Sequence, residues 1–577
     1  MPTIEINYTE FEQALGQKES HRRFGQTPTL NLDALDETLA PLKAEIKTYN
    51  PKENTLSIEM KDTSRADLWS VEGLTRALRS YTGQQKGIKI YTTPHKSPLE
   101  VHVDPNLADI RPYIGCVIIK NIHLNNQAIK SIMHLQDKLD HTQGRNRCRT
   151  SIGIYNLDLI KPPIQYKAVD PSQTSFIPLG ATQQMNLNEI LEKHPKGQEY
   201  GDIIKNKNLY PMLFDSQGNA LSFPPIINSC DLGKITEDSR NLLVEVTGTL
   251  HKTVLTTLTL VTVALIDRGG TAYSVTIHCP QGSLYPETTQ TTPDFSNKAF
   301  ELSVEYTNNL LGLQLSPEQI ADLLNIAGLS VEKTTPSTLT VIVPCYRIDI
   351  MHQVDLIEDV AIAYGYNNIE PLWRELPTTG KPKPDQQLIN IARDLMVGLG
   401  YQEILTPTLT SPETLFKKMN QPPSPLIELS NPQVLTMTCL RNQLLPGIIS
   451  FLGINQSVEF PQKIFELGKI TLIAPSKETC TQDQDWLSAA TSHPNANFSE
   501  IKSTLDAFMT NFDIQFQIKQ TTHPSFIEGR IGKLLVDNTE IGLIGEINPL
   551  VLEQWKLENP TAAFELNLQT LIKNKLS

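Results

Sequence analysis

The order of hydrophobic and polar positions in one stretch of the chain predicts a strand followed by a helix. From Thr338 to Val343, β-branched and apolar residues predict a buried strand, which Pro344 ends. A helical pattern then runs to Gly365. Near the start of the chain, Thr55 to Met60 alternates as a strand, and a helical pattern begins at Asp67. Both places are therefore predicted to be small α/β units.

The two units also share a short motif. Arg65-Ala66-Asp67 corresponds to Arg347-Ile348-Asp349, and a glycine follows each aspartate at the same spacing, Gly83 in the first unit and Gly365 in the second. This agreement indicates a weak internal repeat.

Breaks in the pattern divide the chain into domains of mixed α/β (α+β) class. We expect an N-terminal α/β unit over 1–83, a polar connector over 84–111, a strand-rich module over 112–280, the second copy of the repeat over 298–374, a linker over 375–386 and a C-terminal domain over 387–577. In the C-terminal domain we predict a helix over Leu388 to Leu399, a strand over Leu405 to Leu409 and a hairpin that turns at Asp537-Asn538. An antiparallel sheet flanked by helices is expected there.

Composition excludes several classes of protein. The net charge of −13 excludes an overall basic surface for nucleic acid. The seven cysteines are scattered without a Cys-x-x-Cys pair, which argues against zinc knuckles and disulfide frameworks. The longest apolar runs are too short to span a bilayer, and the N-terminus lacks a secretory signal. We therefore expect a cytoplasmic protein that does not enter a membrane.

Four carboxylates gather in the second unit. Asp349 lies between the strand and the helix, and Asp355, Glu358 and Asp359 share one helix face. Their repulsion weakens the helix unless a cation or an arginine lies among them. Hard oxygen ligands at this spacing suit Mg²⁺, whereas a solvated acidic face is the alternative.

The N-terminal unit helps to weigh these alternatives. Its helix has Gly73, Arg76 and Ala77 at the positions of the three helix carboxylates. The fold therefore does not require the carboxylates, which favours a metal in the second unit.

The strand-rich module contains a candidate pocket and a candidate basic patch. On the predicted strand LLVEVTGT, Glu245 and Thr247 face the side opposite to Val244 and Val246. An acid beside a hydroxyl can line a polar pocket, or the pair can face water. The patch comes from four residues that could contact phosphate or form a solvated loop, namely Lys138, Arg145, Arg147 and Arg149.

Several catalytic motifs are absent from the sequence. It has no Gly-rich phosphate loop ending in Lys-Ser/Thr, no His-Glu-x-x-His and no Gly-x-Ser-x-Gly. The residues alone therefore indicate a multidomain α/β protein with one candidate magnesium site and one candidate polar pocket.

Longer motifs resemble one family, the phenylalanyl-tRNA synthetase beta subunits of the archaeal/eukaryotic type. VPCYRIDIMHQVDLIEDVAIAYGYNNIEP is similar to the family's B5 module, which is winged-helix-like. LQDKLDHTQGRNRCRTSIGIYNLD, HPKGQEY, LSFPPIIN and VEVTGT resemble its B3/B4 editing module. GLGYQEILTPTLTSPETLF, LRNQLLPGIISFL, PQKIFELG, HPSFIEGR and IGLIGEINP resemble its C-terminal domain, a catalytically silent relative of the class II synthetase core. The resemblance covers essentially the whole chain.

The resemblance implies a function and a set of residues for it. The beta subunit would join an alpha subunit in an α2β2 heterotetramer that attaches phenylalanine to tRNA(Phe), with the alpha subunit binding ATP and catalysing aminoacylation. The B3/B4 module would hydrolyse mischarged Tyr-tRNA(Phe), with an editing pocket near Leu213, Ser222, Glu245 and Thr247. The Mg²⁺ ligands would be Asp349, Asp355, Glu358 and Asp359.

Two other classes of function remain compatible with the residues. One is a non-catalytic scaffold that binds RNA or protein, with editing lost. The other is a self-sufficient Mg²⁺-dependent hydrolase that uses the Glu245 and Thr247 pocket. The acidic position of the pocket adds a requirement, because Glu245 is one methylene longer than aspartate and needs more space.

Overall fold

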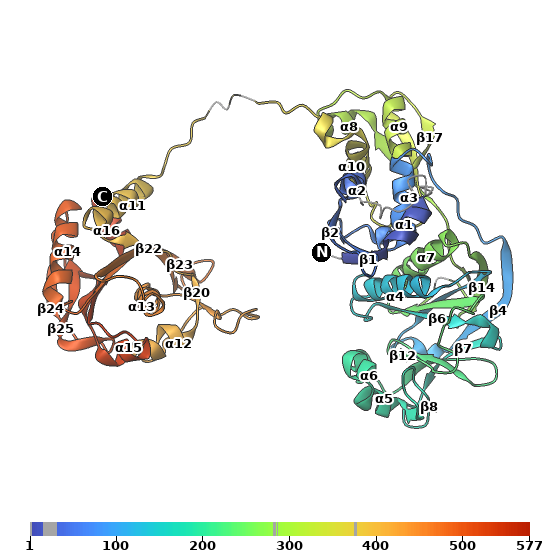
Figure 1. Cartoon of the computed structure of the whole chain (residues 1–577), viewed down its shortest axis with the longest axis horizontal. Coiled ribbons are helices and arrows are strands. Elements are labelled where there is room, and N and C mark those ends of the chain that lie inside the picture. The colour runs from blue at the N-terminus through green and yellow to red at the C-terminus, as the bar shows by residue number, and fades with distance from the viewer. Residues whose placement is uncertain are drawn as a thin grey trace. The chain divides into compact units, whose positions relative to one another are not determined.

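The structure is a computed structural model that describes residues 3–15, 32–280, 284–285, 287–373, 375 and 378–576. Contacts divide the chain into two units, Met1–Leu372 and Trp373–Ser577 (Figure 1). Both units mix helices with sheets, which confirms the predicted mixed α/β, multidomain class. Among the helices described, none combines the length and the apolarity that crossing a bilayer requires.

The first part of unit 1 is a three-stranded sheet with helices. Its elements are β1 (Thr3–Asn7), α1 (Tyr8–Leu15), α2 (Leu32–Leu39), β2 (Ala44–Asn50), β3 (Thr55–Met60), the 3-10 turn η2 (Ala66–Leu68) and α3 (Val71–Tyr81). The strand order is β1-β3-β2. The helix predicted from Asp67 is interrupted after η2, and Ser70 starts α3 by accepting a hydrogen bond from the backbone N–H of Gly73 at 3.1 Å.

The second copy of the repeat has the same topology. Its elements are β16 (Lys298–Ser303), α8 (Val304–Leu311), α9 (Pro317–Ile326), β17 (Ser330–Thr334), β18 (Thr338–Val343) and α10 (Gln353–Tyr364). The order β16-β18-β17 again puts the last strand in the centre. Arg65 pairs with Asp67 and Arg347 pairs with Asp349, so the shared motif makes the same ion pair twice. Arg65 Nε also lies 4.0 Å from Asp349 Oδ1, which places the two motifs beside each other.

The chain between the two copies forms a ten-stranded sheet. Its order is β12-β11-β10-β7-β4-β14-β5-β13-β6, with β15 paired to β14. The strands are β4 (His95–Val103), β5 (Tyr113–Lys120), β6 (Thr150–Asn156), β7 (Ile164–Val169), β10 (Tyr210–Phe214), β11 (Ala220–Phe223), β12 (Ile227–Asn228), β13 (Leu242–Gly248), β14 (Thr271–His278) and β15 (Thr289–Thr292). Apolar side chains of α4 (Asn126–His141) and α7 (His251–Asp267) pack against β5, β13 and β6. A small β8 (Ser175–Phe176) and β9 (Met185–Asn186) pair precedes α5 (Leu187–Lys193) and α6 (Pro195–Tyr200).

The expectation of a polar connector over 84–111 is wrong in its second half. Strand β4 lies there, and it pairs in parallel with both β7 and β14. Leu99 and Val101 are buried in the core, while Glu100 and His102 point to the other face. The charged residues and Pro98 hide this alternation in the sequence, so the segment resembles a loop.

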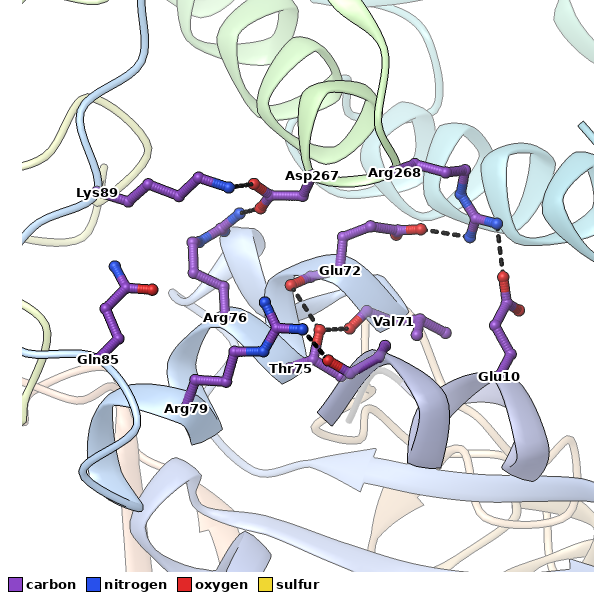
Figure 2. A pocket seen from close by; sticks show the side chains of 11 residues that line it. Glu10, Val71, Glu72, Thr75, Arg76, Arg79, Gln85, Lys89, Asp267 and Arg268 are labelled. Carbon is purple, nitrogen blue, oxygen red and sulfur yellow. Dashed lines mark hydrogen bonds and ion pairs between the residues drawn. The ribbon is translucent and has the colours of Figure 1, made fainter. Parts of the chain in front are cut away.

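An ion-pair network joins the N-terminal copy to α7 (Figure 2). Arg268 pairs with both Glu10 and Glu72. Asp267 accepts hydrogen bonds from Arg76 and, at 2.6 Å, from Lys89. Arg76 occupies the position that holds Glu358 in the second copy. The first copy therefore uses this position to bind α7, which explains why it carries no carboxylate there.

Unit 2 is a seven-stranded sheet between two layers of helices. Its order is β19-β22-β23-β27-β26-β25-β24, antiparallel except for the β19–β22 pair. The strands are β19 (Gln402–Glu403), β22 (Gln462–Ile473), β23 (Thr481–Ser492), β24 (Gln517–Gln520), β25 (Phe526–Val536), β26 (Thr539–Ile547) and β27 (Thr561–Leu566). Helices α11 (Pro384–Gly398), α14 (Phe498–Asn511) and α16 (Leu568–Leu576) pack on one face, and α13 (Leu445–Ile454) and α15 (Pro549–Gln554) on the other. Helix α12 (Pro412–Leu415) and the pair β20 (Leu409–Thr410) and β21 (Cys439–Leu440) complete the unit.

Two expectations for this unit can be compared directly with the structure. The hairpin at Asp537-Asn538 is confirmed, because both residues have the positive φ angles, 50° and 64°, of a tight hairpin turn. The strand predicted over Leu405 to Leu409 is wrong, because β20 begins only at Leu409. Pro407 lies inside that run and lacks the N–H that a ladder needs. The predicted linker is also shorter, since α11 already begins at Pro384.

Candidate functional site

Strand β13 presents a buried carboxylate to the core of the large sheet. Glu245 is only 2% exposed and Thr247 is fully buried, so the alternative that this pair faces water is excluded. Val244 and Val246 pack on the opposite face, against α4 and α7. This alternation agrees with the one predicted from the sequence. A buried acid must find partners or change its protonation.

Tyr155 is the hydrogen-bond partner of Glu245, and it also contacts Ser222 near the other end of the sheet. The Tyr155 hydroxyl, from β6, lies 2.9 Å from Glu245 Oε1 and 2.8 Å from Ser222 Oγ, from β11. Strand β6 ends the order of the sheet and β11 is next to its other end. The sheet therefore curls until its two ends meet, and Glu245 and Ser222 lie at that meeting point.

A glycine provides the space that the longer acid needs. Gly153 in β6 is paired directly with Glu245. A β-carbon at position 153 would lie 2.5 Å from Glu245 Oε1 and 2.2 Å from the Tyr155 hydroxyl oxygen, closer than atoms can approach. The absence of a side chain at Gly153 therefore accommodates both the glutamate and the tyrosine.

A cavity of about 330 Å³ opens onto this carboxylate. Apolar residues make up just over half of its lining, and the rest is polar and includes the charged side chains of Asp137, Arg147, Lys196, Lys234 and Glu245. Glu245 and Ser222 line it together with apolar side chains that include Met133, Ile152, Ile154 and Phe223.

The other two predicted pocket residues do not line the cavity. Thr247 Oγ1 accepts a hydrogen bond from Arg111 Nε at 2.9 Å and lies 3.2 Å from Ser151 Oγ. Leu213 is paired with Ser222 across the ladder and is buried in the core beside Tyr155. Both residues therefore lie behind residues that line the cavity, Thr247 behind Ser151 and Leu213 behind Ser222.

Burial sets the charge state of Glu245. It raises the pKa of the carboxyl group to about 7, against the opposing effects of the Tyr155 hydrogen bond and of Arg111. Glu245 Oε2 is buried and has no hydrogen-bond partner among the residues that the structure describes. Unpaired buried acceptors are rare, so this oxygen is suited to a donor from a bound ligand.

The four carboxylates of the second copy line a separate small hollow of about 60 Å³. An arginine does lie among them: Arg347, which is 4% exposed, donates to Asp349 at 2.7 Å and to Asp359 at 2.8 Å. Asp355 Oδ2 accepts hydrogen bonds from the backbone N–H groups of Met351 and His352, both at 2.8 Å, and Glu358 pairs with Lys43. Arg347 thus supplies the arginine that the sequence analysis named as one way to relieve the repulsion of these carboxylates.

In this arrangement the four carboxylates are held by partners from the protein. Among the described residues, one group of at least three His, Cys, Asp or Glu side chains brings its ligand atoms within 4.8 Å of one another, and it is not this one. Asp349 and Asp359 are neutralised by Arg347. A metal ion would have to displace Lys43 from Glu358.

Comparison with known proteins identifies the family. A family model described as the tRNA synthetase B5 domain matches residues 300–366, and one described as the phenylalanyl tRNA synthetase beta chain CLM domain matches residues 369–568. The phenylalanine–tRNA ligase beta subunit of Pyrococcus furiosus is 40% identical over 575 residues, which covers 99% of this chain and 100% of that protein. The chain belongs to the phenylalanine–tRNA ligase beta-subunit family. This confirms the resemblance drawn from the motifs.

Further relatives agree with this assignment. The beta subunit of Thermococcus kodakarensis is 38% identical over 588 residues, which covers 99% of both chains. A crystal structure of an N-terminal fragment of the beta subunit from Pyrococcus horikoshii is 37% identical, covers 63% of this chain and 100% of that fragment, and superposes with a TM-score of 0.58. Three archaeal members of the family thus share the sequence or fold of this chain over long stretches.

One arginine of this family member, Arg111, has a role that the sequence did not indicate. Arg111, which is 1% exposed, donates to Thr247, to Ser151 and to the backbone oxygen of Arg147. It follows a turn in the predicted connector, and no sequence signal distinguishes it from a surface arginine.

Tyr155 could have been found from the sequence. It lies on the same face of β6 as Gly153 and Ser151, and Gly153 is the residue that pairs with Glu245.

The expectation that Arg147 contacts RNA is not supported by its position. Its side chain pairs with buried Asp140 at 3.0 Å and lies over the ring of Tyr200, 4.3 Å from the ring centre. It also donates to the backbone oxygens of Pro225 and Ile226, and so it shapes one wall of the cavity. The patch that stays a candidate for RNA contact is therefore reduced to Lys138, Arg145 and Arg149.

Proposed function

We propose that this chain acts in the cytoplasm as the beta subunit of a complex that attaches phenylalanine to tRNA(Phe). The partner would be an alpha subunit that binds ATP with Mg²⁺ and catalyses aminoacylation. The beta subunit would remove tyrosine from tRNA(Phe) in the Glu245 cavity. Membership of the family supports the first part, and the unpaired acceptor at Glu245 Oε2 is the observation that carries the second.

The chemistry of the cavity fits the difference between the two amino acids. Tyrosine differs from phenylalanine by one hydroxyl, and a site for an apolar ring rejects an added hydroxyl only weakly, by about a hundredfold. The Glu245 cavity would instead prefer tyrosine to phenylalanine. A phenol can donate to Glu245 Oε2, whereas a phenylalanine ring leaves this oxygen unpaired at a cost of about 1–3 kcal/mol. The cavity would therefore select the wrong amino acid for hydrolysis.

The hydrolytic step needs a water molecule that attacks the ester carbon. Ser222 Oγ, 2.8 Å from the Tyr155 hydroxyl, can hold the ester or that water at the cavity wall. We assign no general base, because Glu245 is used for recognition. The Thr247 hydroxyl accepts a hydrogen bond from Arg111, so Thr247 would position the neighbouring Ser151 and would not contact the ester itself.

Assembly with the alpha subunit tests the first part of the proposal. Because unit 2 resembles a synthetase core that lacks catalytic motifs, we expect it to keep its fold in order to pair with a catalytic subunit. Mixing this chain with its alpha subunit should give an α2β2 particle in size exclusion with light scattering. The chain alone should show no ATP–pyrophosphate exchange. If the mixture runs as separate monomers, or if the lone chain exchanges pyrophosphate, the proposal is wrong.

The magnesium prediction can be tested at Asp355 and Glu358, the two carboxylates that do not pair with Arg347. Replacing Asp355 with Asn and Glu358 with Gln should abolish Mg²⁺ binding measured by calorimetry, because the other two carboxylates are neutralised by Arg347. Replacing Lys43 with Met frees Glu358 and should strengthen Mg²⁺ binding. If neither change alters the titration, the four carboxylates do not hold the ion.

A further inference from the structure

We infer that Glu100, His102 and His278 form a binding site for a divalent transition metal such as Zn²⁺, on the face of the large sheet opposite to the buried side chains of Leu99, Val101, Val275 and Ile277. His102 lies directly across from His278 on the paired strands β4 and β14, and Glu100 is two residues before His102 on the same face. Their ligand atoms all lie within 4.8 Å of one another, and this is the one such group among the described residues.

The local fold explains why these side chains face outward together. Leu99 and Val101 in β4, and Val275 and Ile277 in β14, belong to the buried core of the sheet. Because side chains alternate along a strand, the residues between them point to the other face. Both histidine side chains are partly exposed, whereas His278 Nε2 itself is buried.

The contacts within the trio resemble those around a shared ion more than those of a hydrogen-bonded pair. His278 Nε2 lies 3.2 Å from Glu100 Oε2, yet it has no well-aligned hydrogen bond among the described residues. Two ligand atoms, each about 2.1 Å from a tetrahedral metal ion, are separated by about 3.4 Å, and neither points at the other. The two imidazole rings are stacked nearly parallel with centres 4.8 Å apart, so they must turn relative to each other before both nitrogens point at one ion.

The chemistry of the ligands selects the class of metal. Two imidazoles and one carboxylate suit Zn²⁺, Cu²⁺ or Ni²⁺, whereas Mg²⁺ and Ca²⁺ prefer ligand sets made of oxygen alone. Three protein ligands leave one position of a tetrahedral ion open to water. The ion would also tie β4 to β14, two strands from distant parts of the chain. This site lies outside the Glu245 cavity and does not depend on the proposed function.

The test is Zn²⁺ binding to the full chain without an affinity tag, after removal of metals by a chelator. The thiols are alkylated first, because Cys148 and Cys480 are exposed and could bind Zn²⁺ themselves. We expect one Zn²⁺ per chain in calorimetry, and a higher midpoint of thermal unfolding with Zn²⁺ than with Mg²⁺. His102→Ala and His278→Ala should each weaken binding by about a hundredfold, because each removes one of three protein ligands.

Two further variants separate loss of a ligand from loss of fold. Glu100→Gln keeps the shape of the side chain but removes its charge, and it should also weaken Zn²⁺ binding. His123→Ala changes an exposed histidine outside the trio and should bind Zn²⁺ like the unmodified chain. Circular dichroism checks that each variant is folded. Absence of Zn²⁺ binding to the unmodified chain, or binding that survives both substitutions in the trio, would overturn the inference and leave an ordinary surface ion pair.

Discussion

Replacing Glu245 with alanine is expected to slow the clearance of tyrosyl-tRNA(Phe) by the assembled ligase while it still charges tRNA with phenylalanine. The substitution removes the buried oxygen that would accept the phenol hydroxyl, and with it the advantage of tyrosine over phenylalanine in the cavity. One hydrogen bond to a buried carboxylate contributes about 1.5–3 kcal/mol, so the deacylation rate should fall by about tenfold to a hundredfold. The measurement is the rate of release of tyrosine from preformed tyrosyl-tRNA(Phe).

Matched variants locate this effect at the recognised hydroxyl. Glu245→Gln keeps an acceptor oxygen and has no charge, and it should fall between the unmodified subunit and Glu245→Ala. Gly153→Ala places a carbon against Glu245 Oε1 and should also impair clearance, although it leaves the acid in place. Equal clearance by Glu245→Ala and the unmodified complex would show that another residue discriminates. Absence of clearance by the unmodified complex would mean that editing has been lost.

The sequence revealed the positions of the carboxylates but not the side chains that surround them. Alternation along β13 correctly placed Glu245 on the face opposite to Val244, because this pattern is a local property of the strand. Tyr155, the partner of Glu245, lies on the neighbouring strand β6, whereas Ser222 comes from β11 and meets Tyr155 only because the sheet curls. No local pattern contains that curvature, so the contact of Ser222 with Tyr155 was not predicted, and no sequence signal indicated the contact of Arg111 with Thr247.

The repeat shows a similar limit. Its strand and helix pattern was visible twice in the sequence, and the structure gives both copies the same strand order. The sequence also required a cation or an arginine among the carboxylates. The spacing of the residues could not show which of the two is present, because it does not tell whether the Arg347 side chain turns toward the carboxylates or toward solvent. Only the folded backbone brings Arg347 from before α10 against Asp359 inside it.

Replacing Arg347 with methionine is expected to be the most destabilising single change in the second copy of the repeat. The substitution leaves Asp349 and Asp359 without their shared cation, and breaking a buried ion pair by removing one partner costs about 3–5 kcal/mol. Burial raises the pKa of Asp359 and Arg347 opposes this effect, so the substitution should raise the pKa of Asp359 further. Hydrogen exchange at the amides of α10 in the full chain measures the local loss of stability.

The N-terminal copy supplies the matched control. Arg65→Met removes the corresponding arginine, whose main partner is the single buried carboxylate of Asp67, and it should be less destabilising than Arg347→Met. Adding Asp359→Asn to Arg347→Met removes one of the two orphaned charges and should recover part of the protection of α10. Recovery by Mg²⁺ instead would show that a metal ion can take the place of the arginine. Protection in Arg347→Met within about 1 kcal/mol of the unmodified chain, a change typical of surface substitutions, would show that Arg347 is not what neutralises these carboxylates.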